Sequence, residues 1–539
     1  MASPSERLAR SAGLAGSATL ASRILGLARD QVLAALFGAG NEMDAFVVAF
    51  RIPNLARTLL AEGAMSAAFV PTFIRHLAER GKPDAWRLGS NVINALILTT
   101  GIAVIAGVFF ARPIVTLYAG SYRNVAGKLE LTILLTRVML PFLTFAAVAA
   151  ALMGMLNSLH HYFLPALSPA MFNIVTIVCA LTLTPFMPVI GLPRVMAISV
   201  AAVLGGIGQV AVQWIPLRRE GFRYSPTLRL RDEGLLRVLV LMGPGTIGLA
   251  ATQVNLLVNT LLATSQGTGA ASWLAYAFRL MYLPIGLFGV SIATAVLPAA
   301  SQHAAAADLA ALRATVARGI RLMLMLNVPA TFGLLALATP IVRLLFERGQ
   351  FAPADTMATA SAVRLYAIGL VAYSTARIAS PVFYAVGRSR VPVAVSGVSI
   401  AVNILASLTL IRFMGFRGLA LSTSLAAIAN AGALVWLLRR QLHGLEGRQL
   451  ARAAAKMIAA ASAMAIAAML VEHASAYLIG GKGVVAQAIR LLASIAAALG
   501  VLAGVAKLLR VEEFDDALDG LRALARESFG SGTISASGA

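Results

Sequence analysis

Long runs of apolar residues, separated by short polar segments, follow one another along almost the whole chain. A run of about 20 apolar residues predicts a transmembrane helix, because that length crosses the hydrocarbon core of a bilayer. A helix also satisfies its own backbone N–H and C=O groups, for which the lipid offers no hydrogen-bond partners. The pattern therefore predicts an all-α polytopic membrane protein. Its fourteen predicted spans lie near residues 11–38, 44–74, 88–111, 129–157, 164–185, 194–216, 234–264, 270–300, 322–339, 355–386, 392–411, 417–438, 453–473 and 484–506.

A short repeated pattern divides these spans into groups. An Ala-Phe-Arg sequence ends at Arg51 in the second span and at Arg279 in the eighth, and prolines follow both arginines. Such internal repeats commonly flank a central site in transporters. We therefore predict two pseudo-symmetric six-helix lobes plus two C-terminal helices. The predicted domains are an N-terminal lobe at 1–220, a C-terminal lobe at 221–445, helices 13 and 14 at 446–510, and a cytoplasmic tail at 511–539.

Composition supports the membrane class, and the distribution of charge orients the chain. Apolar residues make up 59% of the 539 residues, charged residues 12%, and the mean hydropathy is +0.83. The net charge of +22 is concentrated in short loops on one predicted side, for example at Arg218, Arg219 and Arg223. Basic loops stay on the cytoplasmic side of a membrane. We therefore expect both termini in the cytoplasm and no nucleic acid as a partner.

Arginines inside the predicted spans are the clearest functional feature. Arg23, Arg29, Arg51, Arg57 and Arg279 interrupt apolar runs. An arginine at mid-bilayer costs roughly 2.5–3.5 kcal/mol on insertion scales, so such residues normally face water, a partner or a ligand.

Two interpretations fit the first span. Arg23 and Asp30 are seven residues apart and share a helical face, while Arg29 lies about 120° away. The arginines form either a basic wall for an anionic substrate or part of an internal ion-pair network that holds helices together. Asp44 and Glu62 are the further acids that such a network could use.

The second span carries a polar stripe. Arg51, Asn54, Thr58 and Glu62 lie along one face, and Arg57 lies beside Asn54. A guanidinium has a planar donor fork that meets two oxygen atoms of a phosphate at once and stays charged. The stripe therefore predicts a cavity lining that binds a phosphate or pyrophosphate group.

Several motifs of this chain, taken together, resemble those of the MurJ/MviN family, and the resemblance runs in order along nearly all of the chain. They are Ser22-Arg23-Ile24-Leu25-Gly26, Ala28-Arg29-Asp30, Asp44-Ala45-Phe46, Pro53-Asn54 through Arg57 to Ala61-Glu62-Gly63-Ala64, Phe69-Val70-Pro71, Ser272-Trp273 with Arg279-Leu280, and Leu345-Phe346 with Gly349, Phe351 and Asp355.

The resemblance implies a lipid II flippase of the multidrug/oligosaccharidyl-lipid/polysaccharide exporter superfamily. It implies fourteen helices in two lobes around a cationic cavity, located in the cell inner membrane. The substrate would be the undecaprenyl-pyrophosphate-linked disaccharide-pentapeptide of peptidoglycan synthesis, moved between leaflets by alternating access. The last two helices would form a groove for the lipid tail, and the cell-division or elongation machinery would be a partner.

The same resemblance assigns site residues by family position. Arg23, Arg29, Arg57 and Arg279 match the essential cavity arginines. The associated polar positions are Asp30, Asp44, Asn54, Glu62 and Ser272. Members of the family commonly have an Asp just before the later arginine, whereas this chain has Phe278.

Three functional hypotheses stay open at this point. The first is a flippase for a lipid-linked precursor, the second an ion-coupled small-molecule exporter, and the third a membrane-embedded polyprenyl-phosphate transferase. Enzyme motifs such as the P-loop and His-Glu-x-x-His do not occur, and the single cysteine, Cys179, predicts neither a disulfide nor a cysteine metal site. We expect no cofactor. Sodium, protons or the membrane potential would drive transport, although in the second half no carboxylate lies near the middle of a predicted span, and Glu472 lies near an end.

Overall fold

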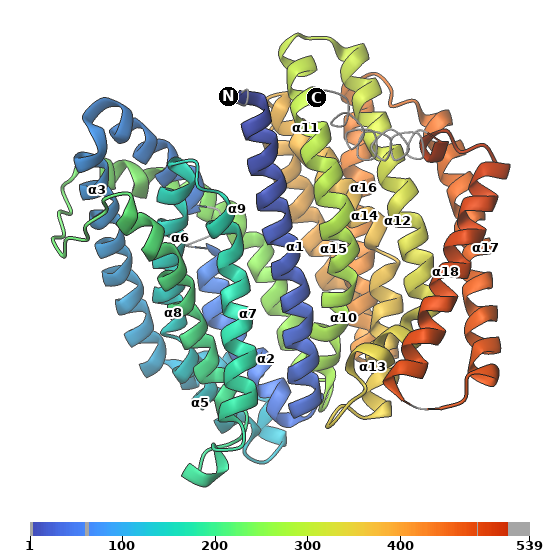
Figure 1. Cartoon of the computed structure of the whole chain (residues 1–539), viewed down its shortest axis with the longest axis horizontal. Coiled ribbons are helices and arrows are strands. Elements are labelled where there is room, and N and C mark those ends of the chain that lie inside the picture. The colour runs from blue at the N-terminus through green and yellow to red at the C-terminus, as the bar shows by residue number, and fades with distance from the viewer. Residues whose placement is uncertain (1–3, 60–63, 482, 516–539) are drawn as a thin grey trace, which may run out of the picture. The chain divides into compact units, whose positions relative to one another are not determined.

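The computed structural model describes residues 4–59, 64–481 and 483–515, which are mostly helical and contain no β-strand (Figure 1). These residues fall into two compact units. Unit 1 holds the described residues up to Tyr276 together with Phe346–Asp355. Unit 2 holds Ala277–Leu345 and the described residues from Thr356 onward. The predicted lobe boundaries stay a prediction.

Unit 1 is built from the helices of the first half of the chain. They are α1 (Pro4–Phe37), α2 (Asn41–Arg57), α3 (Ala64–Phe109), α4 (Ala111–Ala119), α5 (Lys128–Met139), α6 (Phe142–Ser158), α7 (Phe163–Leu183), α8 (Met196–Arg219), α9 (Glu233–Thr264) and the start of α10 (Ala270–Pro284). The α1 helix packs along α7, and α3 packs along α6. A row of rings links this core, since Trp86 lies 5.8 Å from Phe73 and 5.4 Å from Phe222 between ring centroids.

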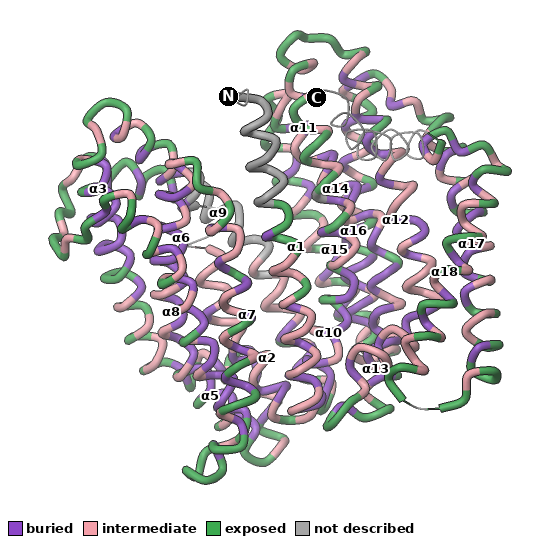
Figure 2. The backbone as a smooth tube through the Cα atoms, in the orientation of Figure 1, coloured by how far each residue is buried: buried purple, intermediate pink, exposed green. Residues whose placement is uncertain are grey.

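Unit 2 contains the remaining helices. They are the end of α10, a π-helical turn at Ile285–Gly289, α11 (Val290–Ala305), α12 (Leu309–Phe346), α13 (Pro353–Ala367), α14 (Leu370–Ala385), α15 (Arg390–Met414), α16 (Phe416–Gln441), α17 (Gly447–Leu478) and α18 (Val484–Leu508). Its main core joins α11, α12, α14 and α16 through side chains such as Val316, Val382 and Leu438. Figure 2 shows the buried positions along these helices.

The last two helices, α17 and α18, pack against each other through small residues. Ala460, Ala461, Ala468 and Ser494 are fully buried there, and small side chains allow membrane helices to approach closely. Met457 and Ala461 share a hydrophobic cluster with Val328 of α12. The predicted C-terminal pair of helices is therefore present.

The number of spans is confirmed only in part. Among the described residues, ten helices are long and apolar enough to cross a membrane, or eleven if α13 and α14, bent by 42°, form one span. The predicted spans at 11–38, 44–74 and 234–264 do not meet this criterion as single helices. The first of these contains Arg23, Arg29 and Asp30, which lower its hydropathy, and the second is covered only in part by α2, which has 17 residues.

The second predicted span differs most from the structure. The α2 helix ends at Arg57, and the chain is described again as a helix from Ala64. Residues 64–109 then form α3, which is interrupted at Gly81, where φ is +78°. A glycine reaches this left-handed region without steric cost. The end of the predicted second span and the whole third span thus lie on either side of Gly81.

Candidate functional site

Arg29 lies in the C-terminal half of α1, between an acid and an amide. Its Nε and Nη2 atoms donate hydrogen bonds of 3.0 and 2.6 Å to Oδ1 of Asp30. Its Nη1 atom donates to Oδ1 of Asn173 on α7 at 3.1 Å, and Asn173 in turn donates to the carbonyl of Ser22. The guanidinium also lies 5.9 Å from the ring of Phe172. These contacts fix the position of Arg29 while Asp30 offsets its charge.

Arg23, six residues earlier on the same helix, has a different environment. It is half-buried, and within the part of the chain that the structure describes it makes no hydrogen bond or ion pair. Asp30 pairs with its neighbour Arg29, at 2.6 Å between Nη2 and Oδ1. Of these two arginines, Arg23 therefore keeps the less compensated charge.

The polar stripe of the second span lies on α2. Arg51, Asn54 and Arg57 are all half-buried. Arg51 and Arg57 each take part in further interactions, and the carbonyl of Asn54 accepts a hydrogen bond from Thr58. Glu62 lies outside the described residues.

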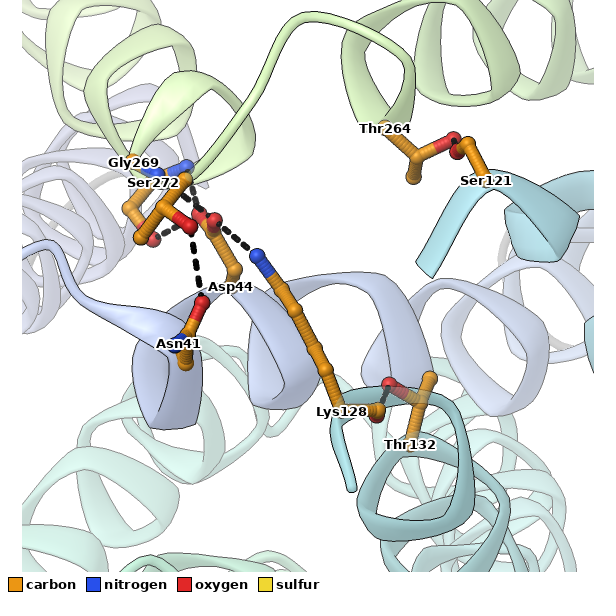
Figure 3. Close-up of polar contacts among 9 residues, drawn as sticks. Asn41, Asp44, Ser121, Lys128, Thr132, Thr264, Gly269 and Ser272 are labelled. Atoms are coloured by element: carbon orange, nitrogen blue, oxygen red, sulfur yellow. Dashed lines mark hydrogen bonds and ion pairs between the residues drawn. The ribbon is translucent and has the colours of Figure 1, made fainter. Parts of the chain in front are cut away.

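Asp44, at the other end of α2, is fully buried and accepts four hydrogen bonds (Figure 3). Its Oδ1 atom accepts from the backbone N–H of Ser272 at 3.0 Å and from the Ser272 hydroxyl at 2.7 Å. Its Oδ2 atom accepts from the backbone N–H of Gly269 at 2.7 Å. Asp44 thereby caps the first turn of α10, where backbone N–H groups lack helical partners.

The fourth donor to Asp44 is Lys128, the first residue of α5. Its Nζ atom lies 2.8 Å from Oδ2, and both side chains are almost completely buried. The same ammonium lies 4.2 Å from the ring centroid of Tyr122. The ion pair joins α2, α5 and the start of α10 at one end of unit 1, and we call these contacts the Asp44 cluster.

The segment 346–355 closes the same end of unit 1. The Nε1 atom of Trp273 donates to Asp355 at 2.8 Å, and the N–H of Gln350 donates to the carbonyl of Ala35 at 2.9 Å. Gly349 has φ +57°, and a Cβ atom there would collide with the Ala35 carbonyl. The end of α1, the start of α10 and this segment are therefore held together.

Arg279 belongs to unit 2, where its side chain is exposed. The neighbouring Phe278 stacks on Tyr282 with 6.0 Å between ring centroids and meets Tyr366 edge-on at 5.5 Å. The position just before Arg279, where the resemblance implied an Asp, thus contributes to an aromatic cluster, and Phe278 cannot pair with Arg279 through a carboxylate.

Three polar residues at these sites were not predicted. Asn173 holds Arg29, Lys128 neutralises Asp44, and Arg377 of α14 contacts Tyr282. Arg377 could have been found in the sequence, because it lies inside the predicted span 355–386. Lys128 lies one residue before a span, and nothing local connects it with Asp44.

Metal-binding residues are not gathered anywhere in the described ranges. No group of three or more His, Cys, Asp or Glu side chains lies there close enough to hold a metal ion. Cys179 is buried and unpaired.

Comparison with known proteins identifies the family. The family model described as "Lipid II flippase MurJ" matches residues 33–485. A probable lipid II flippase MurJ of Bdellovibrio bacteriovorus is 34% identical over 505 residues, covering 92% of this chain and 94% of that protein. A probable lipid II flippase MurJ of Vibrio cholerae is 34% identical over 448 residues, covering 81% of this chain and 83% of that protein.

A solved structure agrees with these relatives. The structure named "Lipid II flippase MurJ, inward closed conformation" matches with a TM-score of 0.73 and 25% identity, covering 92% of this chain and 99% of that one. Of the three functional hypotheses, the comparisons support the flippase, which is a transporter and not an enzyme. The sequence motifs, the helical fold and the similarity over most of the chain agree that this protein belongs to the MurJ family of lipid II flippases.

Proposed function

We propose that this protein moves lipid II from the inner to the outer leaflet of the bacterial cytoplasmic membrane by alternating access. The observation that carries this proposal is the placement of Arg23, Arg29 and Arg57 within unit 1 on helices that run through a largely apolar protein. Their half-buried side chains combine charge with partial access to solvent. Arg279 would supply the fourth cation from unit 2. The ligand suited to such a set is the pyrophosphate of the lipid-linked precursor.

The contacts of Arg29 suggest how pyrophosphate would reach this arginine. Asp30 and Asn173 occupy its donors in the absence of substrate. An entering pyrophosphate would replace Asn173 most readily, because Asn173 is neutral and its displacement leaves no buried charge unpaired. Arg23, which lacks such a partner in the described chain, would make the first contact.

Alternating access requires the predicted outer end of the protein to open and close. By the predicted threading, Asp44, Lys128 and the start of α10 all lie on the outer side. We propose that the Asp44 cluster stabilises the closed state of this end, and that its contacts break or move together when the substrate is released.

We also propose that the chain crosses the membrane fourteen times, forms two lobes and keeps both termini in the cytoplasm. Labelling of single engineered cysteines from either side of the membrane would test the threading.

The remaining features are also proposals. The α17–α18 pair would receive the lipid tail, and the cell-division or elongation machinery would be a partner. Sodium, protons or the membrane potential would supply the driving force. Ionophores that collapse each gradient separately would identify it.

Binding of lipid II to the purified full-length protein tests the pyrophosphate site. An Arg23→Ala/Arg57→Ala/Arg279→Ala variant should lose binding, since three of the four cations are removed. Replacement by Lys at the same positions should reduce lipid II binding only in part, because lysine keeps the charge but lacks the planar donor fork of the guanidinium. Arg112→Ala is a matched control, since Arg112 forms an exposed ion pair with Glu130 at 2.8 Å. Undiminished binding by the triple Ala variant would contradict the proposal.

A further inference from the structure

Unit 2 contains a cavity that the family's pyrophosphate arginines do not explain. It has a volume of about 500 Å³ and lies between α11 and α14. Thr294, Tyr373, Arg377 and Ser380 supply its polar groups. Alanine, leucine and proline side chains form the rest of the wall. A cavity of this size accommodates a group as large as a small ligand, but only part of a disaccharide-pentapeptide.

Arg377 gives the cavity its charge. Its Nη2 atom donates a 2.7 Å hydrogen bond to the hydroxyl of Tyr282, and its guanidinium lies 5.5 Å from the centroid of the Tyr282 ring. Both contacts hold the guanidinium in place without neutralising it. No acidic side chain pairs with Arg377 in the part of the chain that the structure describes. A guanidinium has five N–H donors, and Tyr282 takes one of them.

Through Tyr282, the guanidinium of Arg377 lies close along α10 to Arg279, a residue of the proposed substrate path. Tyr282 lies one helical turn after Arg279 on α10, roughly 4.5 Å along the helix axis at 1.5 Å per residue. Arg377 is thus anchored, within unit 2, one turn beyond a predicted pyrophosphate ligand. On the predicted threading this turn is directed toward the cytoplasm. A charged residue inside a membrane span is a candidate for substrate contact.

The chemistry of the cavity favours one part of the precursor. A pyrophosphate carries several negative charges and needs several cations, whereas this cavity offers one guanidinium among apolar walls. A single carboxylate on a short apolar chain matches it, because the guanidinium fork meets both carboxylate oxygens and the walls cover the aliphatic part. The pentapeptide stem of the precursor ends in such a carboxylate.

We propose that the cavity at Arg377 is a subsite for a carboxylate of the peptide stem of the lipid-linked precursor. The proposal rests on the proposed flippase function and extends it, because it assigns a second anion contact that recognises the peptide. Tyr282 is the positioning residue, since it orients Arg377. Phe278 stacks on Tyr282 and completes the aromatic support.

The test compares three ligands on the purified full-length protein. They are lipid II, the same lipid with its peptide carboxylates converted to amides, and undecaprenyl pyrophosphate. Wild type should bind lipid II roughly ten- to a hundredfold more tightly than the amide form, the range expected for hydrogen bonds to a charged group. Arg377→Gln should remove this preference and leave the binding of undecaprenyl pyrophosphate unchanged. Arg377→Lys should restore part of the preference.

Two further variants test the role of Tyr282 and provide a control. Tyr282→Phe retains the ring and removes the hydrogen bond, so it should reduce the preference for the carboxylate form only in part. Arg388→Gln, at an exposed arginine beyond the end of α14, should bind all three ligands like wild type.

The outcomes separate the subsite from the function itself. If Arg377→Gln keeps the full preference for carboxylates, or weakens all three ligands equally, the subsite proposal is wrong while the flippase proposal stands. If wild type binds none of the three lipids, the proposed function itself fails, and the subsite proposal with it.

Discussion

At the scale of single residues, the main feature is the buried carboxylate of Asp44 and the groups that pair with it. Asp44 and Ser272 were predicted as associated polar positions, and the structure brings them within 2.7 Å of each other. Lys128, which completes the cluster, could not be predicted, because its partner lies 84 residues away. A resemblance identifies positions one at a time, whereas ion pairing depends on how helices pack.

The Asp44 cluster gives a prediction about stability. Asp44→Asn should leave Lys128 buried without a counter-ion, and breaking one partner of a buried pair typically costs about 3–5 kcal/mol. The measurement is thermal unfolding of the purified protein in detergent. Asp44→Asn/Lys128→Met should be less destabilised than Asp44→Asn, because no buried charge is left unpaired.

Glu130→Gln provides the control for this prediction. Glu130 pairs with Arg112 on the surface, where both side chains are more than half exposed, and such pairs contribute about 0–1 kcal/mol. Equal unfolding temperatures for Asp44→Asn and Glu130→Gln would show that the buried pair has no special role.

At the scale of elements, the sequence predicts where helices lie better than where they are interrupted. The predicted spans 164–185 and 484–506 agree with α7 and α18 within a few residues. The predicted span 44–74 falls on α2 up to Arg57 and on α3 from Ala64, and residues 60–63 lie outside the described ranges. The turn at Gly81 lies in a polar segment between two predicted spans, and the sequence pattern therefore indicates it.

The contact between α1 and the segment 346–355 depends on a glycine. Gly349→Ala should destabilise the protein, because a methyl group would collide with the Ala35 carbonyl and φ is positive there. Gly101→Ala in α3 is the matched control, since nothing lies within 4 Å of the added methyl group. Alanine is also the better helix former, so Gly101→Ala should be neutral or stabilising. A Gly349→Ala protein with the unfolding temperature of wild type would contradict this account.

A second contact between elements responds to pH. Glu220, just after α8, lies 3.0 Å from Nε2 of His161 and 3.0 Å from Nζ of Lys82. The hydrogen bonds from His161 and Lys82 lower the pKa of Glu220 below its usual 4.5. A lowered pKa means that this stabilisation is present above pH 4.5 and is lost as the pH falls through the lower, folded-state pKa.

Glu220→Gln cannot ionise, and it should therefore lose less stability than wild type when the pH is lowered below 4.5. At pH 7 the variant should be less stable by about 1 kcal/mol or less, because the pairs are largely at the surface. Unfolding temperatures measured from pH 7 downward would check both points. Identical acid profiles for the two proteins would exclude a contribution from Glu220.

At the scale of the whole molecule, family membership rests on agreement along most of the chain. The family model covers residues 33–485, and the fold matches a solved MurJ structure over 92% of the chain. Apolar runs and span arginines predicted the membrane class and an anionic substrate. They could not predict the substrate's identity, because many lipid-linked anions would satisfy the same arginines; the family motifs narrowed it to lipid II.

We propose that the protein carries lipid II across the membrane on Arg23, Arg29, Arg57 and Arg279. The most direct measurement is the exposure of lipid II on the outer leaflet of cells depleted of this protein and complemented with wild type, Arg279→Ala or Arg112→Ala. Exposure should be restored by wild type and by Arg112→Ala, while Arg279→Ala should leave the precursor inside. Normal exposure in depleted cells without complementation, or full rescue by Arg279→Ala, would contradict the account.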